Sequence, residues 1–283
     1  MWWEQRGAGL SYRRDISPET MTVEQLVDDT LEVTRYVRHR FATDQVYLLG
    51  HSWGSFIGLQ AAARAPELFR AYVGMAQITH QIRSEHESYE RMLEQYGARG
   101  DRRMARRLER SPVTTTVPLP AGYDALRDRA MHGLGGGTTH AMRSVVRGIF
   151  LPSLLSRDYS AAQKVNLWRG KLHSRHLGLW DRMLATDPTA LVPRLEIPAY
   201  FLHGAHDLTV SYAQARAYAR TLQASIVGFY TFDHSAHSPA FEEPERTRAI
   251  FRDDVLTGST GRADGPDPEP RHRTRTPWPG GGL

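Results

Sequence analysis

The chain has 283 residues, of which 40% are hydrophobic and 24% charged, as is ordinary for a globular protein of one or two domains. It contains no cysteine, which excludes disulfides and thiolate metal sites, and no apolar stretch approaches the roughly 18 residues of a membrane span. The net charge is +5, and no signal peptide is visible, so we expect a cytoplasmic protein without a membrane partner.

The first predicted element is a helix over residues 22–41. Thr22 and Gln25 have the spacing of a capping box, and apolar residues recur behind them at helical intervals. The pattern then changes to an alternation of short apolar runs and helix-like stretches, which is typical of an α/β protein with a mostly parallel sheet. The next elements are a strand at 46–49, a helix at 56–64 and a strand at 71–76.

A glycine-flanked serine follows directly after the strand predicted at residues 46–49. Residues 50–54 read Gly-His-Ser-Trp-Gly and lead into the helix predicted at residues 56–64. A strand, a sharp turn with glycines around a serine, and then a helix together form the pattern of a nucleophile elbow. The pattern predicts that Ser52 is the nucleophile, although the pentapeptide alone also occurs in many unrelated turns.

An acid and a histidine follow two later strands in the order that a serine hydrolase of this type requires. The apolar run 198–202 leads to Asp207, and the run 226–232 leads to His237. A serine hydroxyl needs a base to take its proton, and a carboxylate can hold that base in the right tautomer. We therefore expect Ser52, His237 and Asp207 to act as nucleophile, base and acid.

Other residues could fill two of these roles. Asp233 is the rival acid, but it lies on the same loop as the histidine, and His234 is the rival base. His203 and His206 flank the acid and are interpreted as loop histidines. No His-Glu-x-x-His spacing or other metal motif is present, so no metal and no cofactor are expected.

Residues 78–190 interrupt the alternation of strands and helices. They are polar and rich in arginine, and they are predicted to be mostly helical, with Trp168 and Trp180 as apolar anchors. The glycine-rich run at 133–137 lacks the ending of a phosphate loop and is interpreted as a turn within this region. The basic run at 99–110 has no interleaved aromatic residues, so it favours a solvated helix face over a nucleic-acid surface.

These patterns predict four parts. A closing helix is expected over residues 241–256, and the Gly- and Pro-rich residues after it are too polar to offset their ordering entropy. The parts are the first half of the core at 1–77, a helical cap at 78–190, the second half of the core at 191–256 and a disordered tail at 257–283.

Three segments resemble the prolyl-aminopeptidase-like (proline iminopeptidase) branch of the α/β-hydrolases. Residues 2–11 (Trp-Trp-Glu-Gln-Arg-Gly-Ala-Gly-Leu-Ser) are similar to its Asp-Gln-Arg-Gly-x-Gly-x-Ser segment, with Glu4 in place of Asp. Residues 50–55 resemble its elbow, and residues 235–239 resemble its Ser-x-His-Ser-Pro. The resemblance implies the α/β-hydrolase fold with a helical cap insertion, catalysis by the predicted triad and an oxyanion-hole amide at Trp53.

The resemblance also implies a substrate and a defect. The substrate would be a small ester or amide, or a short peptide with an N-terminal proline, whose ammonium group caps of this family hold with carboxylates. The acidic residues at the start of the cap are Glu85, Glu87 and Glu90. The family carries His-Gly-Gly-Pro-Gly upstream of residue 1, which implies an N-terminally truncated hydrolase with a strand remnant at residues 1–3 and an unpaired edge on the strand at 46–49. The alternative is an inactive remnant or mis-started fragment that acts at most as a binding module.

Overall fold

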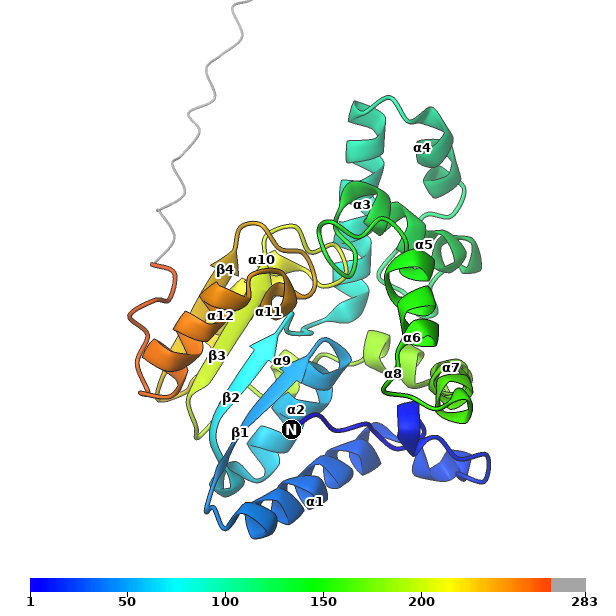
Figure 1. Cartoon of the computed structure of the whole chain (residues 1–283). Helices are drawn as coiled ribbons and strands as arrows, with labels where there is room; N and C mark the ends of the chain where they lie inside the picture. The colour runs from blue at the N-terminus through cyan, green and yellow to red at the C-terminus, as the bar shows by residue number, and fades with distance from the viewer. Residues whose placement is uncertain (266–283) are drawn as a thin grey trace, which may run out of the picture.

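Four parallel strands form the centre of the molecule (Figure 1). The computed structural model describes residues 1–265, except for the side chains of residues 174–176. The strands lie side by side in the order of the chain and are β1 (Val46–His51), β2 (Phe69–Met75), β3 (Ala199–Gly204) and β4 (Val227–Phe232). The strands predicted at 46–49, 71–76, 198–202 and 226–232 are therefore present, and the α/β class is confirmed.

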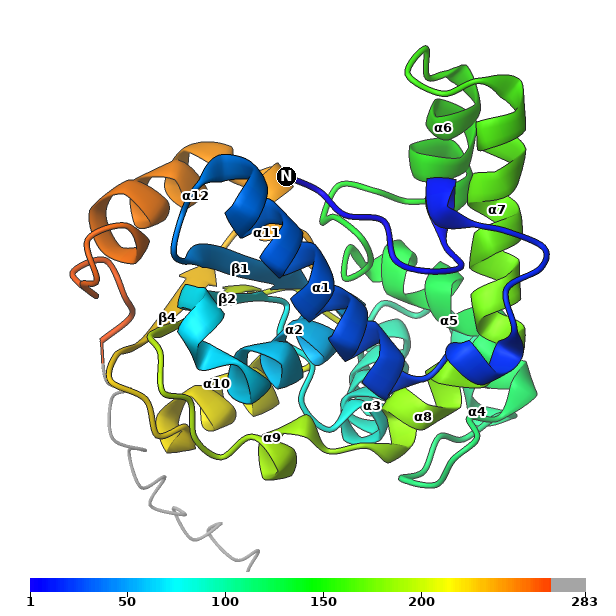
Figure 2. The same ribbon diagram turned by 90° about the horizontal axis from the view of Figure 1, so that it is seen from below.

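Helices cover both faces of the sheet, as the two views of Figures 1 and 2 show. One face carries α1 (Val23–Phe41), α2 (Trp53–Arg64) and α10 (Tyr212–Thr221). The other face carries α11 (Pro239–Glu242), α12 (Pro244–Ile250) and the π-helical turn η5 (Phe251–Val255). Every residue of β3 is buried, as is typical of a parallel strand that is covered on both sides.

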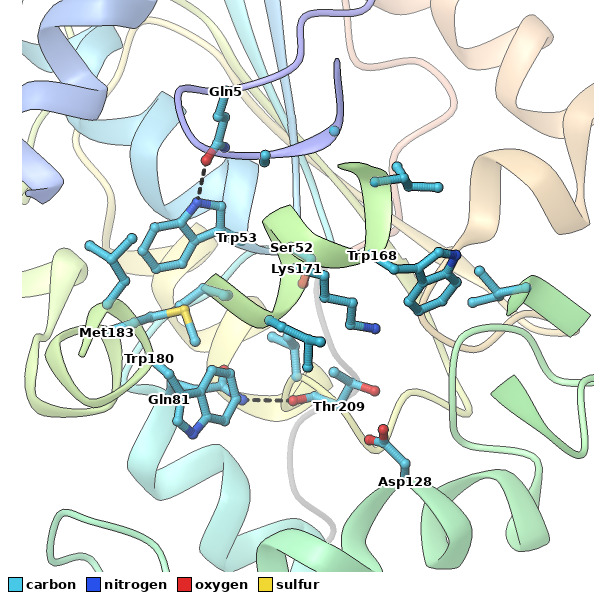
Figure 3. A pocket seen from close by; sticks show the side chains of 18 of the residues that line it. Gln5, Ser52, Trp53, Gln81, Asp128, Trp168, Lys171, Trp180, Met183 and Thr209 are labelled. Carbon is cyan, nitrogen blue, oxygen red and sulfur yellow. Dashed lines mark hydrogen bonds between the residues drawn. The ribbon is translucent and has the colours of Figure 1, made fainter. Parts of the chain in front are cut away.

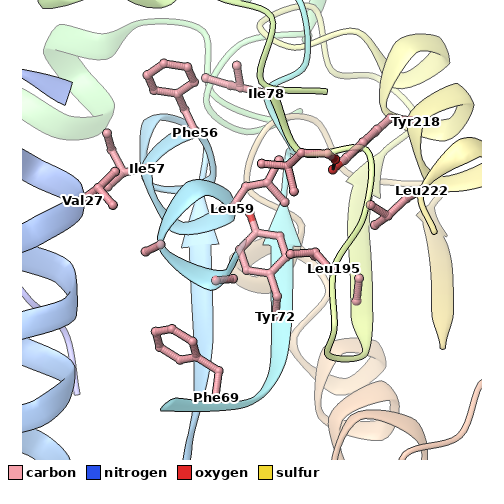
Figure 4. Packing of buried hydrophobic residues seen from close by; sticks show 14 of the residues in the cluster. Val27, Phe56, Ile57, Leu59, Phe69, Tyr72, Ile78, Leu195, Tyr218 and Leu222 are labelled. Carbon is pink, nitrogen blue, oxygen red and sulfur yellow. Dashed lines mark hydrogen bonds between the residues drawn. The ribbon is translucent and has the colours of Figure 1, made fainter. Parts of the chain in front are cut away.

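The larger core cluster packs α2 between α1 and the sheet (Figure 4). Alternate residues of β2 and β3 face it, and Tyr72 and Phe201 are fully buried there beside Phe56 and Leu59 of α2. Burying a large apolar side chain contributes about 1.5–3 kcal/mol, so this cluster holds α2 firmly against β1 and β2. The start of α2, which follows Ser52, is thereby fixed in place.

A long helical insertion, residues 76–198, separates β2 from β3 and builds a second core of its own. We call these residues the insertion. Tyr123 and Met92 lie at the centre of its core, and Leu208 of the sheet part packs against it. Its helices are α3 (Gln81–Ala98), α4 (Arg102–Glu109), α5 (Ala121–Leu134), α6 (Leu151–Leu155), α7 (Ala161–His176), α8 (Leu179–Ala185) and α9 (Pro188–Leu191).

Short helical turns complete the described chain. These are η1 (Gly9–Ser11), η2 (Pro18–Thr20), η3 (Pro66–Leu68) and the π-helical turn η4 (Val146–Phe150). None of the helices within residues 1–265 combines the length and the apolar character needed to cross a membrane. The arginines of α4 are exposed, as expected for a solvated helix face. The division into core and cap at residues 78–190 stays a prediction.

Two expectations for the ends of the sheet part are corrected, and one is met. Residues 1–3 form no strand, because they pair with no neighbour and Trp2 instead stacks on Phe241, with their ring centroids 6.2 Å apart. The strand β1 pairs only with β2 among the described residues, so its other edge is unpaired as expected. The closing helix predicted at 241–256 is divided, because Pro244 lacks the backbone N–H that would continue α11 into α12.

The predicted disordered tail begins too early. Residues 257–265 are ordered against β4, where Asp264 donates its backbone N–H to the Phe229 carbonyl at 2.8 Å and accepts two hydrogen bonds from the backbone N–H of Thr231. Composition did not reveal this, because the contact uses backbone groups of an edge strand rather than apolar surface. The rest of the predicted tail, residues 266–283, lies outside the described residues.

Candidate active site

Ser52 occupies a strained turn between β1 and α2. Its backbone has φ 53° and ψ −120°, a combination that non-glycine residues rarely adopt. The turn is tight enough that a Cβ on Gly50 would lie 2.4 Å from the Gly54 carbonyl oxygen, so a side chain at position 50 would push strand and helix apart. A half-buried serine that lines a cavity at such a turn, directly after a strand, has the geometry of a nucleophile elbow.

The backbone N–H of Trp53 lies at the start of α2, directly after Ser52. The first N–H groups of a helix have no partner within the helix, and together with the helix dipole they favour negative charge nearby. The N–H of Trp53 has no hydrogen-bond partner among the described residues. The indole is fixed separately, because its Nε1–H donates to Oε1 of Gln5 at 2.8 Å.

The acid and the histidine predicted from the sequence are in direct contact. Nδ1 of His237 lies 2.9 Å from Oδ2 of Asp207, and both side chains are buried. The other carboxylate oxygen of Asp207 accepts backbone N–H groups from Thr209 at 2.7 Å and Val210 at 3.1 Å. Burial alone would raise the pKa of Asp207, but the charge and hydrogen bond of His237 outweigh it and hold the pKa below its usual value.

The rival residues lie elsewhere. Asp233 and His234 are both exposed, and neither contacts His237. Ser52 and His237 are not joined by a hydrogen bond in the described part of the chain. Catalytic hydrogen bonds are often long before substrate binds, so the lack of a direct bond is compatible with a nucleophile and its base.

His51, the neighbour of Ser52, anchors the loop that carries the base. Its Nε2–H donates to the carbonyl oxygen of His237 at 2.8 Å, and the two rings lie 5.0 Å apart. Burial, reinforced by the charge of His237, lowers the pKa of His51 to about 4. His51 is therefore neutral near pH 7, and the sequence offered no signal for this contact beyond its place beside the serine.

The interpretation of His203 as a loop histidine is wrong. It lies within β3, fully buried, with its Nε2 3.5 Å from Asp207 Oδ2 and 3.2 Å from the Val210 carbonyl oxygen. Burial lowers its pKa, so it packs behind the acid as a neutral ring. His206 does lie in the loop, where it is exposed and stacks on His140.

A cavity of about 800 Å³ lies in front of Ser52, between the elbow and the insertion (Figure 3). Figure 3 shows Trp53 and Trp180 on one side of it and Trp168 on the other. The volume falls in the range of pockets for small-molecule ligands. The charged residues that line it are Arg6, Asp124, Arg127, Asp128 and Lys171.

The three glutamates predicted to bind substrate do not line this cavity. Glu85 is fully buried behind it, where its carboxylate accepts hydrogen bonds from Arg127 at 2.7 and 2.5 Å. Glu87 accepts a hydrogen bond from Ser211 at 2.5 Å, and Glu90 is exposed. Spacing along the sequence could not separate them, because it does not reveal which side of α3 faces the core of the insertion.

Two carboxylates that the sequence analysis missed do line the cavity. Asp124 and Asp128 are four residues apart on α5, so they lie on one face of that helix. Arg127 lies between them and is paired with Glu85, and its guanidinium lies 5.5 Å from the Trp180 ring centre. The i, i+4 spacing on a predicted helix was the available signal, but the polar composition of the whole insertion obscured it.

Comparison with known proteins agrees with this geometry. A family model described as the alpha/beta hydrolase fold matches residues 5–244. The chain is 29% identical over 251 residues to a protein of Bacillus subtilis (strain 168) named probable aminopeptidase YbaC, covering 86% of this chain and 75% of the relative.

Solved structures show the same fold. The crystal structure of VinJ aligns with a TM-score of 0.54 at 17% identity, covering 89% of this chain and 79% of that chain. A proline iminopeptidase-related protein from Thermus thermophilus aligns with a TM-score of 0.52 at 18% identity, covering 89% of this chain and 77% of that one. At these identities the likeness to the solved structures concerns the fold alone. Together with the family match, it confirms the resemblance to the α/β-hydrolases that the sequence predicted.

Proposed function

Because the chain belongs to the α/β-hydrolase fold family, we propose that it is a serine hydrolase that cleaves a small ester or amide through an acyl-enzyme. Ser52 is the proposed nucleophile, His237 the base and Asp207 the acid that orients it. The observation that carries the proposal is the pairing of a serine in a strained strand-to-helix turn with a buried Asp–His pair on two neighbouring strand ends.

The reaction would proceed in two balanced halves. Oγ of Ser52 attacks the substrate carbonyl while His237 takes the hydroxyl proton, and the backbone N–H of Trp53 donates to the oxygen that becomes negative. The intermediate collapses as His237 returns the proton to the leaving alcohol or amine, which leaves an ester on Ser52. Water, deprotonated by the same histidine, then releases the acid and restores the serine.

Asp207 would hold His237 in the tautomer that this sequence needs. With the Nδ1 side of the ring bound to the carboxylate, the proton on Nδ1 is fixed, and Nε2 is left as the basic atom. The carboxylate also stabilises the positive ring that forms after proton transfer. Backbone donors from Thr209 and Val210 keep the carboxylate in place.

The insertion would act as the cap over the reaction. Its helices α5, α7 and α8 supply most of the wall facing Ser52, so bound substrate would be surrounded by protein rather than water. A substrate with a free amino group, such as a short peptide with an N-terminal proline, would be held by Asp124 and Asp128. The name of the Bacillus subtilis relative supports an aminopeptidase, and the carboxylates in the cavity are compatible with one.

The test uses a fluorophosphonate probe, which labels activated serines, on the full chain. We expect labelling of the wild type, loss of labelling in Ser52→Ala, and unchanged labelling in Ser11→Ala, a serine on the exposed η1 turn. A panel of ester and amino-acyl amide chromogenic substrates then identifies the class. Labelling that persists in Ser52→Ala would refute the assignment, and a folded wild type with neither labelling nor turnover would favour a binding module.

A further inference from the structure

The glycine-rich end of α5 lies against both loops that carry the acid and the base. Helix α5 ends at Leu134, and Gly135 follows in the left-handed conformation with φ 78° and ψ 20°. The N–H of Gly135 donates to the His132 carbonyl at 3.1 Å, and that of Gly136 donates to the Met131 carbonyl at 2.9 Å. These two bonds form a Schellman motif, which ends the helix and turns the chain sharply toward the sheet.

The next two carbonyl groups reach across to the sheet part of the molecule. The Gly136 carbonyl accepts the N–H of Leu208 at 2.9 Å, and the Gly137 carbonyl accepts the N–H of His237 at 3.3 Å. Leu208 is the residue after Asp207. One short segment of the insertion is therefore bonded to the backbone of the acid loop and to the backbone of the base itself.

The contact leaves no room for side chains on the segment. A Cβ on Gly136 would lie 2.3 Å from Cγ of Leu208, and a Cβ on Gly137 would lie 2.5 Å from atoms of the His132 ring. The His132 ring cannot easily move aside, because its two nitrogens lie 2.7 Å from the Asp128 carbonyl and 3.1 Å from the backbone nitrogen of Thr138. Glycine is thus required at 136 and 137 by the closeness of approach.

The backbone of His237 is held from two directions. Its N–H is bonded to Gly137 of the insertion, and its carbonyl is bonded to His51 of the elbow at 2.8 Å. Its side chain is bonded to Asp207, whose own loop is bonded to Gly136. A displacement of the glycine segment would therefore move the acid and the base relative to each other and relative to Ser52.

We propose that residues 135–137 are a positioning segment through which the insertion holds Asp207 and His237 in register for catalysis, an inference that rests on the proposed function. Gly136 positions the acid loop, and Gly137 positions the base. The segment touches no reacting atom and does not line the cavity, so the loss of its contacts would slow the chemical step more than it would weaken substrate binding. Misplacement of catalytic groups by about 1 Å can lower rates by about 100-fold.

The experiment compares Gly136→Ala and Gly137→Ala with Gly97→Ala, the control. Gly97 lies in α3, where an added Cβ meets no atom within 4 Å. We expect kcat to fall about 10- to 100-fold in the first two variants, with KM within about threefold of the wild type, and neither to change in the control. Circular dichroism establishes folding in each case.

A second readout does not depend on activity. The proton shared by Nδ1 of His237 and Asp207 gives a far-downfield ¹H NMR signal, which we expect to shift or broaden in the 136 and 137 variants and to stay in place in Gly97→Ala. This signal reports the Asp–His pair in an inactive protein as well. If only the proposed function is wrong, the signal will still shift in the 136 and 137 variants. If the positioning role is wrong, the signal will have the same position in these variants as in the wild type.

Compensation completes the test. Leu208→Gly removes every side-chain atom that would obstruct a Cβ at position 136, including the Leu208 Cβ at 2.8 Å. Adding it to Gly136→Ala should therefore raise kcat toward that of Leu208→Gly alone and restore the signal. The inference is overturned if kcat stays within about twofold of wild type in both glycine variants, if kcat falls with no change in the signal, or if the double variant recovers neither folding nor rate.

Discussion

The sheet part and the insertion differ in how their sequences relate to their structures. In the sheet part, short apolar runs end at polar loops. Four of these runs form parallel strands, and three of the strands have Ser52, Asp207 or His237 beyond their ends. The insertion carries its chemistry on helices, where Asp124 and Asp128 face the cavity and Glu85 faces inward. The two parts meet at the glycine segment, residues 135–137. Variants in each part can therefore test whether catalysis resides in the sheet and stability in the insertion.

The largest expected effect concerns the acid in the sheet part. Asp207→Asn should lower kcat by about 10,000-fold, because an amide cannot stabilise the imidazolium and favours the wrong tautomer of His237. Asp233→Asn is the matched control, since Asp233 lies on the same loop as the histidine but is exposed. Steady-state kinetics on the best substrate of the panel compare the kcat values of the two variants with that of the wild type. Equal activity of Asp207→Asn and wild type would remove Asp207 from the triad.

The second effect concerns the buried ion pair of the insertion. Arg127→Leu leaves the Glu85 carboxylate fully buried without its bidentate partner, which should lower the free energy of unfolding by about 3–5 kcal/mol. The double variant Glu85→Leu/Arg127→Leu should recover much of that loss, because no uncompensated charge remains. Urea unfolding measures both, with the exposed Arg107→Leu as control. A single variant as stable as wild type would show that the pair is solvated.

The third effect is a pH dependence of the free energy of unfolding that arises from His51. Burial, with the charge of His237, lowers the pKa of His51 to about 4 from 6.5 in the unfolded chain. As the pH falls, the unfolded chain takes up the proton first. The stabilisation is complete above pH 6.5 and is lost progressively down to about pH 4, in total about 3 kcal/mol.

His51→Gln tests this directly. Glutamine can still donate to the His237 carbonyl but does not titrate, so the loss of stability between pH 7 and pH 4 should be smaller in the variant than in the wild type. Urea midpoints at several pH values measure it, and His39→Gln, at an exposed histidine of α1, is the control. Parallel pH curves for His51→Gln and wild type would show that His51 does not titrate as described.

The sequence was informative where one residue type and one position determine the geometry. Gly50 is required by a turn that tolerates no Cβ there, so the glycine-flanked serine between a predicted strand and a predicted helix located the turn. Asp207 could be ranked above Asp233 because it follows a different strand from His237, whereas Asp233 shares the loop of that histidine.

Sequence reasoning failed where position depends on packing. Glu85 and Asp128 are both acidic residues of predicted helices, and only the rotation of α3 and α5 about their axes separates a buried partner of Arg127 from a cavity wall. The glycine run at 133–137 was interpreted as a plain turn, because composition does not reveal a backbone carbonyl that accepts a hydrogen bond from a distant loop. The order of residues 257–265 escaped prediction for the same reason.

The smallest expected effect concerns the contacts between Asp264 and the edge strand β4. Asp264 accepts the backbone N–H of Thr231 and the guanidinium of Arg216 at 2.8 Å, so it satisfies donors on the edge strand β4. Asp264→Ala leaves those donors to water and should lower the free energy of unfolding by about 1–2 kcal/mol. For a chain of this size that corresponds to a fall in melting temperature of about 2–8 °C. Asp15→Ala, at an exposed ion pair with Arg13, is the control and should change it less. A melting temperature of Asp264→Ala equal to that of the wild type would show that the Asp264 carboxylate adds nothing to stability.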